Sequence, residues 1–422
     1  MNSHLDNRNP PDEATLLALR EIARRHGTPT YAFNVPRLRA QVEKLRSHLP
    51  ADVDILYSLK ANASLGICDV FSECGVGADV SSAGEMATAL EAGFPSERIF
   101  VAGPFKLRET IAQLRDAPEA IVSVDSFSEL QSLSEARLAN SAVLRLRPDF
   151  ASCADVPAGS ESRFGFTCEE LDRCRDYLPS CNLVIVGFHV FAGSQVLDAD
   201  ELTEHLRRAL DLSLRTADTL GIAPALINLG GGFGIPYGPN DRELDLIRIG
   251  EELAKLVTRA APARLTLELG RYLVAEAGWY LTSVIGHQTF QGRRAAVVDG
   301  GVHQRADMCG LCLRTNANSP RVLDAASSSL APTDVLGCLS LPDDVLIEAS
   351  PLPQLSPGDV LAFANAGAYG LWSSPSLFHA SPLPAEVAFD GSTIQLMRER
   401  KSAQSILDDQ HHVVQKKETA PS

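Results

Sequence analysis

Lys60 is the first residue of this sequence whose type and position suggest chemistry. It follows an apolar run, Ile55–Leu59, which is typical of a buried strand. A lysine at the end of such a strand is partly desolvated, which lowers the pKa of its amine and makes the amine a better nucleophile. Such an amine can form a covalent bond with a carbonyl compound. The alternative is a lysine whose stem lies on apolar surface while its charge reaches solvent.

Other polar side chains follow further apolar runs. Asp79 comes directly after one of them, His189 follows another by two residues, and Arg145 lies near the end of a third. Glu268 and Arg271 share one short loop, where an arginine can hold a phosphate oxygen and a carboxylate can keep a ring nitrogen protonated. The alternative for this last pair is a local salt bridge on a turn.

Eight short apolar runs separated by amphipathic helical stretches must position these side chains. The count is the one needed to close a (β/α)8 barrel, so we expect an α/β fold whose strand ends share one face. The runs are Ile55–Leu59, Val76–Ala78, Ile99–Val101, Ile121–Val124, Val143–Leu146, Leu183–Gly187, Leu226–Leu229 and Leu265–Leu267.

A glycine run, Gly230–Gly232, follows the seventh of these predicted strands. Its backbone N–H groups can converge on an anion, and a helix opening after it would add a positive dipole. A tight turn without a ligand would use the same glycines. Phosphate sites recur after strands 7 and 8 of such barrels, so we favour an anion site.

The pattern changes after about residue 275, where short strand-like runs separated by Pro, Gly and Ser predict a C-terminal all-β domain. We expect the early run Thr30–Phe33 to join it. The predicted division is residues 37–275 for the barrel, 1–36 and 276–402 for a discontinuous β domain, and 403–422 for a short helix and a flexible tail.

The composition excludes several classes of function. A net charge of -15 argues against nucleic acid as a partner, because binding phosphates needs a basic face. The polar segment Met1–Pro11 does not resemble a signal peptide, and no apolar run is long enough to span a bilayer, so we expect a cytoplasmic protein. Among the nine cysteines, Cys309 and Cys312 form a CxxC pair, but nearby His303 does not complete a zinc site. We therefore expect reduced thiols and no metal.

Six blocks of the sequence resemble motifs of the fold type III pyridoxal 5′-phosphate (PLP) decarboxylases, the ornithine/diaminopimelate/arginine decarboxylase family. The resemblance covers about residues 28–400. It implies an alanine-racemase-like barrel with a C-terminal β domain, PLP as cofactor, and release of CO₂ from an amino acid or an amino-acid-derived substrate. The blocks are Tyr57–Asn62, Asp79–Glu85, Gly187–Gln195, Gly230–Gly234, Glu268–Arg271 and Gly367–Tyr369.

The resemblance implies a role for each matching residue. Lys60 would bond covalently to PLP, and Glu268 would face the pyridine nitrogen. Asp79, Glu85 and Arg145 would line the cofactor near the lysine. The phosphate would be held by Ser194, Gly231, Gly232, Arg271 and Tyr369. The other implied cofactor-binding residues are His189, Phe191 and Gly270.

Cys338 lies where the family has a cysteine supplied by the second subunit. The resemblance therefore implies a homodimer with shared active sites, in which Cys338 protonates the α-carbon. The alternative for Cys338 is one more buried thiol. Substrate contacts are expected from Tyr369 and from Arg305 and Arg314, whose segment could present a cation to a carboxylate; a solvated loop is the alternative for that segment.

Two positions depart from the family pattern. Phe191 stands where a histidine usually stacks on the cofactor, and Leu339 replaces the acidic residue that commonly follows the cysteine. That acidic residue helps recognise a distal amine, so its loss argues against lysine-, ornithine- or diaminopimelate-type substrates. Both departures are similar to a natural-product and siderophore branch, which includes the butirosin-pathway decarboxylase of carrier-protein-bound glutamate. The substrate could thus be free or tethered to an acyl carrier protein.

Several alternatives stay open at this point. They are a diaminopimelate decarboxylase proper, an amino-acid racemase on the same fold, a catalytically silent relative and a metal-dependent barrel hydrolase. Racemases of this fold tend to place an arginine at the pyridine nitrogen, so Glu268 argues against a racemase.

Overall fold

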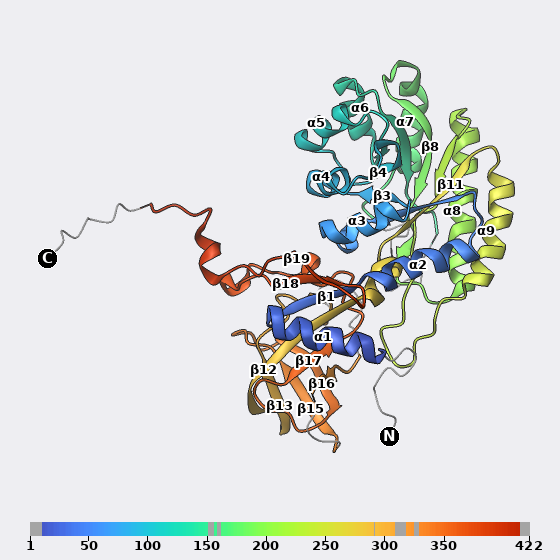
Figure 1. Ribbon diagram of the computed structural model, residues 1–422. Coiled ribbons are helices and arrows are strands. Elements are labelled where there is room, and N and C mark those ends of the chain that lie inside the picture. The colour runs from blue at the N-terminus through green and yellow to red at the C-terminus, as the bar shows by residue number, and fades with distance from the viewer. Residues whose placement is uncertain are drawn as a thin grey trace.

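The computed structural model of the protein describes residues 11–150, 156–157, 162–290, 292–308, 318–324 and 329–413. Arg314, the Cys309–Cys312 pair and the last part of the predicted tail lie outside the described residues. Figure 1 shows a helix-covered barrel at the upper right and a sheet-rich part below it. In the described part of the chain, none of the helices combines the length and the apolar character that crossing a membrane requires.

Eight parallel strands close into a barrel, each of them overlapping one of the predicted apolar runs. The predicted (β/α)8 barrel is therefore confirmed. Around the barrel the strands are β2 (Val53–Ser58), β3 (Gly77–Val80), β4 (Ile99–Val101), β5 (Ile121–Val124), β6 (Ser141–Leu146), β8 (Val184–Val190), β10 (Leu226–Asn228) and β11 (Arg264–Leu269).

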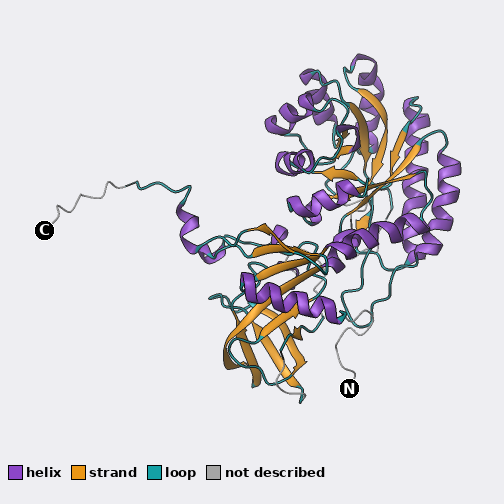
Figure 2. Cartoon of the chain, in the orientation of Figure 1, coloured by secondary structure: helices purple, strands orange, loops and turns teal. Residues whose placement is uncertain are grey.

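Helices cover the outside of this barrel (Figure 2). In α9 (Leu246–Ala260) the buried residues Leu246, Ile249, Leu253 and Leu256 recur at intervals of three or four, which places one apolar stripe against the barrel. Asp245 caps the start of this helix by accepting hydrogen bonds from two backbone N–H groups, a contact worth about 1 kcal/mol. The others are α2 (Val35–His48), α3 (Leu65–Glu73), α4 (Ala83–Glu91), α5 (Arg108–Asp116), α6 (Phe127–Ala136), α7 (Cys168–Tyr177) and α8 (Ala199–Leu220).

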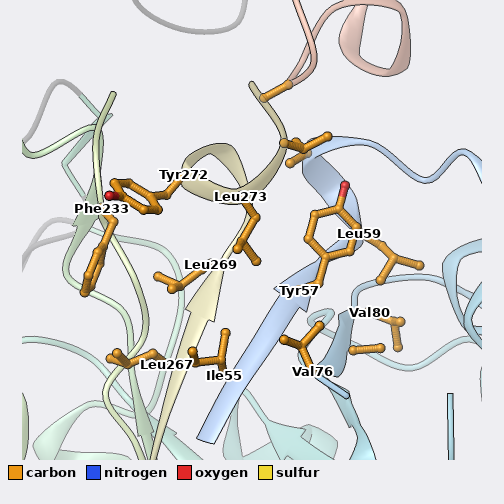
Figure 3. Close-up of a cluster of buried hydrophobic side chains, with 14 of the residues drawn as sticks. Ile55, Tyr57, Leu59, Val76, Val80, Phe233, Leu267, Leu269, Tyr272 and Leu273 are labelled. Atoms are coloured by element: carbon orange, nitrogen blue, oxygen red, sulfur yellow. The ribbon is translucent and has the colours of Figure 1, made fainter. Parts of the chain in front are cut away.

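The packing between β2 and β11 fixes the backbone on which the site is built. Figure 3 shows Ile55 beside Leu267, and the strand register pairs Tyr57 with Leu269. All four side chains are at most 1% exposed. Protein interiors are close-packed and resist displacement. The strand ends that carry the residues after Tyr57 and around Leu269 are therefore held rigidly.

The second part of the chain is built on a nine-stranded sheet. Strand β1 lies between β12 and β18, so a segment that precedes the barrel supplies an inner strand. The strands are β1 (Thr30–Asn34), β12 (Gly278–Phe290), β13 (Arg293–Val298), β14 (Arg321–Val322), β15 (Ala331–Leu336), β16 (Val345–Leu352), β17 (Val360–Phe363), β18 (Ala385–Phe389) and β19 (Ile394–Arg398). The domain bounds given above stay a prediction.

Helix α1 (Glu13–His26) is an element that the sequence analysis did not anticipate. It packs on the sheet through Leu19 and Ile22, which are fully buried against Trp279 and other apolar residues. At the other end of the chain, Ala403–Leu407 forms a 3₁₀ helix, in the segment that projects away from the sheet in Figure 1.

Candidate functional site

A cavity of about 510 Å³ opens at the carboxyl ends of the barrel strands. It is where the closed barrel brings the polar strand-end residues together, as the sequence predicts. Tyr369 reaches it from the loop after β17, and its backbone N–H donates to the carbonyl of Ala61 at 2.8 Å. The sequence-predicted residues that line the cavity are Lys60, Arg145, His189, Phe191, Ser194, Gly232, Glu268, Gly270, Arg271 and Tyr369.

Lys60 lies in a 3₁₀ turn directly after β2, with its side chain 39% exposed. Its Nζ is 3.7 Å from Asp79 Oδ2 and 5.1 Å from the centre of the Phe191 ring. Burial alone would lower the pKa of Lys60, but the carboxylates of Asp79 and Glu268 outweigh it, and the pKa is raised above its ordinary value. The expectation of a lowered pKa is therefore wrong for the chain by itself, because sequence position reveals the desolvation but not the counter-ions.

Asp79 lies behind Lys60, with its side chain fully buried at the end of β3. Its Oδ2 accepts a short hydrogen bond from Ser58 Oγ, and its Oδ1 is buried without a hydrogen-bond partner. A buried carboxylate is costly unless it is paired. The pairing that this geometry provides is the Lys60 ammonium, so Asp79 holds that amine at the cavity wall.

Glu268 lies near the end of β11 and is buried among polar neighbours. Its Oε1 accepts a hydrogen bond from Asn228 Nδ2 at 2.9 Å and lies 3.2 Å from His189 Nε2. Burial and the charge of Asp79 raise the pKa of Glu268 to about 7, against the opposing effect of Lys60 and Arg145. A carboxyl group with this pKa gains and loses a proton near neutral pH.

His189 and Arg145 form the wall next to Glu268. Burial, together with the nearby cations, holds the pKa of His189 well below its usual range, so its imidazole is neutral. Its Nδ1 is 2.9 Å from Ser123 Oγ. The guanidinium of Arg145 donates to Asp125 Oδ1 at 3.1 Å and lies over the Phe164 ring at 4.8 Å.

Arg271 lines the cavity from the start of the short helix α10 (Arg271–Val274) and is 3% exposed. It donates to the Tyr237 hydroxyl at 3.1 Å and to Ser194 Oγ at 3.4 Å, and it lies 4.8 Å from the centre of the Tyr369 ring. Its Nε is buried without a hydrogen-bond partner. A buried guanidinium with a free N–H, surrounded by hydroxyl groups, can bind a phosphate group.

The glycine run reaches the cavity lining through Gly232. Gly230 and Gly232 have φ of 72° and 98°, a region that glycine adopts readily, and a side chain at Gly231 would meet the carbonyl oxygen of Glu268 at 1.9 Å. The expected helix directly after this run is wrong, since the next helix along the chain begins only at Leu246. Its dipole therefore does not contribute, and Arg271 supplies the positive charge instead.

Besides Asp79, which lies behind Lys60, and Gly231, three further sequence-predicted residues in the described part of the chain lie outside the cavity lining. Glu85 Oε2 accepts from the backbone N–H of Ser81 at 2.7 Å, and burial raises the pKa of Glu85 to about 7. Cys338 is exposed in the loop after β15. Arg305 is fully buried in a two-fold contact with Asp307, at 2.8 Å for each hydrogen bond, so the geometry does not support its expected contact with a substrate carboxylate.

Five residues that hold the cavity side chains in place were not predicted from the sequence. They are Ser58, Ser123, Asp125, Asn228 and Tyr237. Asp125 and Asn228 sit at predicted strand ends, the signal that identified Asp79 and Glu268, and could have been found in the same way. The partner of Arg271, Tyr237, lies in a long loop where no local pattern marks it.

Comparisons with known proteins give one consistent result. Residues 35–275 match the family model of the pyridoxal-binding domain of pyridoxal-dependent decarboxylases. The chain is 32% identical to the L-glutamyl-[BtrI acyl-carrier protein] decarboxylase of Niallia circulans, over 94% of this chain and 96% of that one. It is 30% identical to the diaminopimelate decarboxylase of Methanothermobacter thermautotrophicus, over 93% of each chain.

A solved structure gives the same picture. The diaminopimelate decarboxylase of Helicobacter pylori, complexed with L-lysine, superposes with a TM-score of 0.84 at 25% sequence identity. The superposition covers 92% of this chain and 98% of the other. The likeness therefore includes both the barrel and the sheet that follows it.

Proposed function

Since this chain belongs to the pyridoxal-dependent decarboxylases, we propose that its barrel cavity binds PLP through Lys60 and removes CO₂ from an amino acid that carries no distal ammonium group. The enzyme class and the cofactor follow from the family, and the chain is a PLP-dependent decarboxylase. The residue roles and the substrate class are the proposal.

The cavity offers a partner for each polar group of PLP. Arg271, with its unpartnered Nε, would hold the phosphate together with Ser194 and the backbone at Gly232. Lys60 would bond to the aldehyde carbon. Glu268, which is buried in the cavity wall, would face the ring nitrogen.

When bound, PLP supplies an electron sink for the bond that breaks as CO₂ leaves. Glu268, whose pKa of about 7 lets it hold a proton near neutral pH, would share that proton with the ring nitrogen. Phe191 would offer its flat face to the ring, and Asp79 keeps the Lys60 amine at the cavity wall. His189, neutral and buried, adds no positive charge beside Glu268.

One observation supports the substrate class: among the described residues that line the cavity, Glu268 is the only carboxylate. With Glu268 assigned to the ring nitrogen, no acid in that set would pair with a distal ammonium of the substrate. An unpaired ammonium in such a site would be strongly disfavoured. A glutamyl group carried on an acyl carrier protein through its distal carboxyl, as proposed by analogy with the Niallia circulans relative, has no distal charge and meets no such penalty. The distal carboxylate of free glutamate would need a cation, and arginines line this cavity.

Cys338 would act in the cavity of a second copy of this chain. Its thiol is exposed and outside its own cavity, and partial burial with the nearby Asp344 carboxylate raises its pKa above the ordinary value. The thiol therefore keeps its proton at neutral pH and can donate it to a carbon atom. This places a proton donor on the surface, where a homodimer would bring it to the partner's cavity.

The experiment is CO₂ release by the purified, PLP-loaded protein from three substrates at equal concentration. The substrates are L-glutamate on an acyl carrier protein, free L-glutamate and meso-diaminopimelate. We expect either glutamyl substrate to be preferred over diaminopimelate. Faster release from diaminopimelate would overturn the substrate class while leaving the enzyme class in place.

A further inference from the structure

Behind the cavity wall, outside its lining, lies a buried ion pair formed by Lys106 and Glu129. The two side chains are 1% and 2% exposed, and Lys106 Nζ is 3.4 Å from Glu129 Oε1. Lys106 belongs to the loop between β4 and α5, and Glu129 to the first turn of α6. Neither residue touches the cavity, so the roles proposed above leave this pair without a function.

The pair holds one short stretch of backbone at both ends. Lys106 Nζ donates a short hydrogen bond to the carbonyl oxygen of Ser123, the third residue of β5. Glu129 Oε2 accepts from the backbone N–H of Asp125 at 2.7 Å, while its Oε1 accepts from the backbone N–H of Lys106 at 2.9 Å. The segment 123–125 is thus tied to the loop after β4 and to helix α6 through one buried ion pair.

The side chains of that same segment reach two residues of the cavity wall. Ser123 Oγ is 2.9 Å from His189 Nδ1, and Asp125 Oδ1 accepts from Arg145 Nη1 at 3.1 Å. Both contacts come from one strand end. A shift of segment 123–125 would therefore move His189 and Arg145 together.

Stability alone gives little reason for such a pair. Desolvating two charges costs about as much as their attraction returns, and apolar residues of similar volume often serve equally well. Burial lowers the pKa of Lys106, and the Glu129 carboxylate opposes that shift. What the charged pair provides, and an apolar pair would not, is four directed contacts around segment 123–125.

We propose that Lys106 and Glu129 are positioning residues that hold segment 123–125, and through it Arg145 and His189, in the geometry that decarboxylation requires. The proposal rests on the proposed function of the cavity. It concerns geometry, since neither residue contacts the cofactor site.

The test is the double variant Lys106→Met with Glu129→Gln, which removes both charges and so leaves no unpaired buried charge. Its control is Arg293→Met with Asp334→Asn. In this control pair the fully buried carboxylate of Asp334 also accepts hydrogen bonds from an arginine, Arg293 at 3.1 Å, and from a backbone N–H, that of Ala349 at 2.7 Å. The control pair lies in the β sheet. Both double variants are compared with wild type for thermal unfolding, PLP content, kcat and KM.

We expect both variants to fold and to bind PLP, while kcat falls by roughly 10²-fold in the Lys106/Glu129 variant alone, because displacements near 1 Å are that costly in active sites. A kcat equal to that of the control would overturn the proposal. Should the Lys106/Glu129 variant fail to fold, Lys106→Gln with Glu129→Gln, which is likewise uncharged but keeps polar groups at both positions, replaces it in the same comparison.

Crystal structures of the cofactor-free proteins separate this proposal from the function it rests on. We expect Arg145 and His189 to be displaced by more than about 0.5 Å in the variant, the tolerance within which such groups must be held. Unchanged positions would contradict the positioning role even if wild type decarboxylated as proposed. If Arg145 and His189 are displaced in the variant but the wild-type protein binds no PLP, the proposed function is rejected and the positioning role stands.

Discussion

Lys60, Asp79 and Glu268 lie together in the barrel, whereas Cys338 lies alone on the surface of the β domain. The barrel residues meet because parallel strands that close into a barrel end on one face. The loop after β15 ends on no such face, and its thiol does not line the cavity. The difference places the proposed cofactor residues in one chain and leaves Cys338 outside that chain's own cavity, which is why the proposed function assigns it to the cavity of a second copy.

The Cys338 loop is exposed but well held. The buried carboxylate of Asp344 accepts backbone N–H groups from Val302 at 2.7 Å and from Leu339 at 2.8 Å. The N–H of Cys338 itself donates to the carbonyl of Gly300 at 3.0 Å. A surface group that is fixed in this way is suited to entering a partner's site with little loss of conformational entropy.

The largest effect is expected from Lys60→Ala, which removes the amine that binds the cofactor. CO₂ release should fall by roughly 10³-fold or more, as for other groups that act covalently. The visible absorption of lysine-bound pyridoxal should disappear with it. Lys44→Ala, an exposed lysine on α2, is the control and should change neither reading.

Cys338→Ala should separate the two regions. We expect kcat to fall by about 10²-fold, the usual contribution of a general acid, while PLP content stays at the wild-type level. A variant that loses its cofactor as well would show that the loop belongs to the binding site, contrary to the comparison above.

Mixing the two variants after dissociation and reassociation sharpens the same point. In an equal mixture, half of the dimers contain one chain of each variant. If the active sites are shared between chains, each mixed dimer has one intact site out of two, so about a quarter of wild-type activity should return. No recovery in a mixture shown by mass spectrometry to contain mixed dimers would mean that Cys338 acts within its own chain or not at all.

Arg271→Met should weaken PLP binding by roughly 10²-fold, because the phosphate loses its buried charged partner. Pyridoxal, which lacks the phosphate, is the matched ligand and should bind both proteins equally. Each ligand is titrated by fluorescence. Weaker binding of PLP alone would support the phosphate-binding role of Arg271, whereas general damage to the cavity would weaken the binding of both PLP and pyridoxal.

The smallest effect concerns pH and the cofactor-free protein. The pKa of Glu268 is raised to about 7 in the folded chain, from about 4.5 in the unfolded one. The folded state therefore binds more protons between these values, and stability falls as pH rises through that window. The slope includes Glu85, whose pKa is also about 7, so the difference between wild type and Glu268→Gln is the quantity to measure. Across this pH window the free energy of unfolding in urea should fall by on the order of 1–3 kcal/mol more in wild type than in Glu268→Gln. The same pH dependence in both proteins would contradict the raised pKa.

The barrel could be predicted from the sequence because each strand is a short apolar run between helical stretches. Lys60, Asp79 and Glu268 could be predicted because they follow such runs. The raised pKa of Lys60 could not, since it depends on two carboxylates from other strands. Contacts between distant segments leave no local pattern.

The same reason explains the remaining differences. Arg305 was expected to present its cation to a substrate carboxylate, but the fold buries it against Asp307. The expected helix after the glycine run required a helical pattern directly after Gly234, and the chain first passes through a loop up to Asp245. The Lys106–Glu129 pair joins a loop to a helix, and neither residue stands out in its own segment.

The most direct test of the account is to map where the cofactor bonds. Wild-type protein is loaded with PLP and reduced with borohydride, which makes the lysine–pyridoxal bond permanent, and its peptides are then analysed by mass spectrometry. The account predicts one pyridoxyl group per chain, on the peptide that contains Lys60. A label on another lysine, or no label in a folded protein, would contradict it.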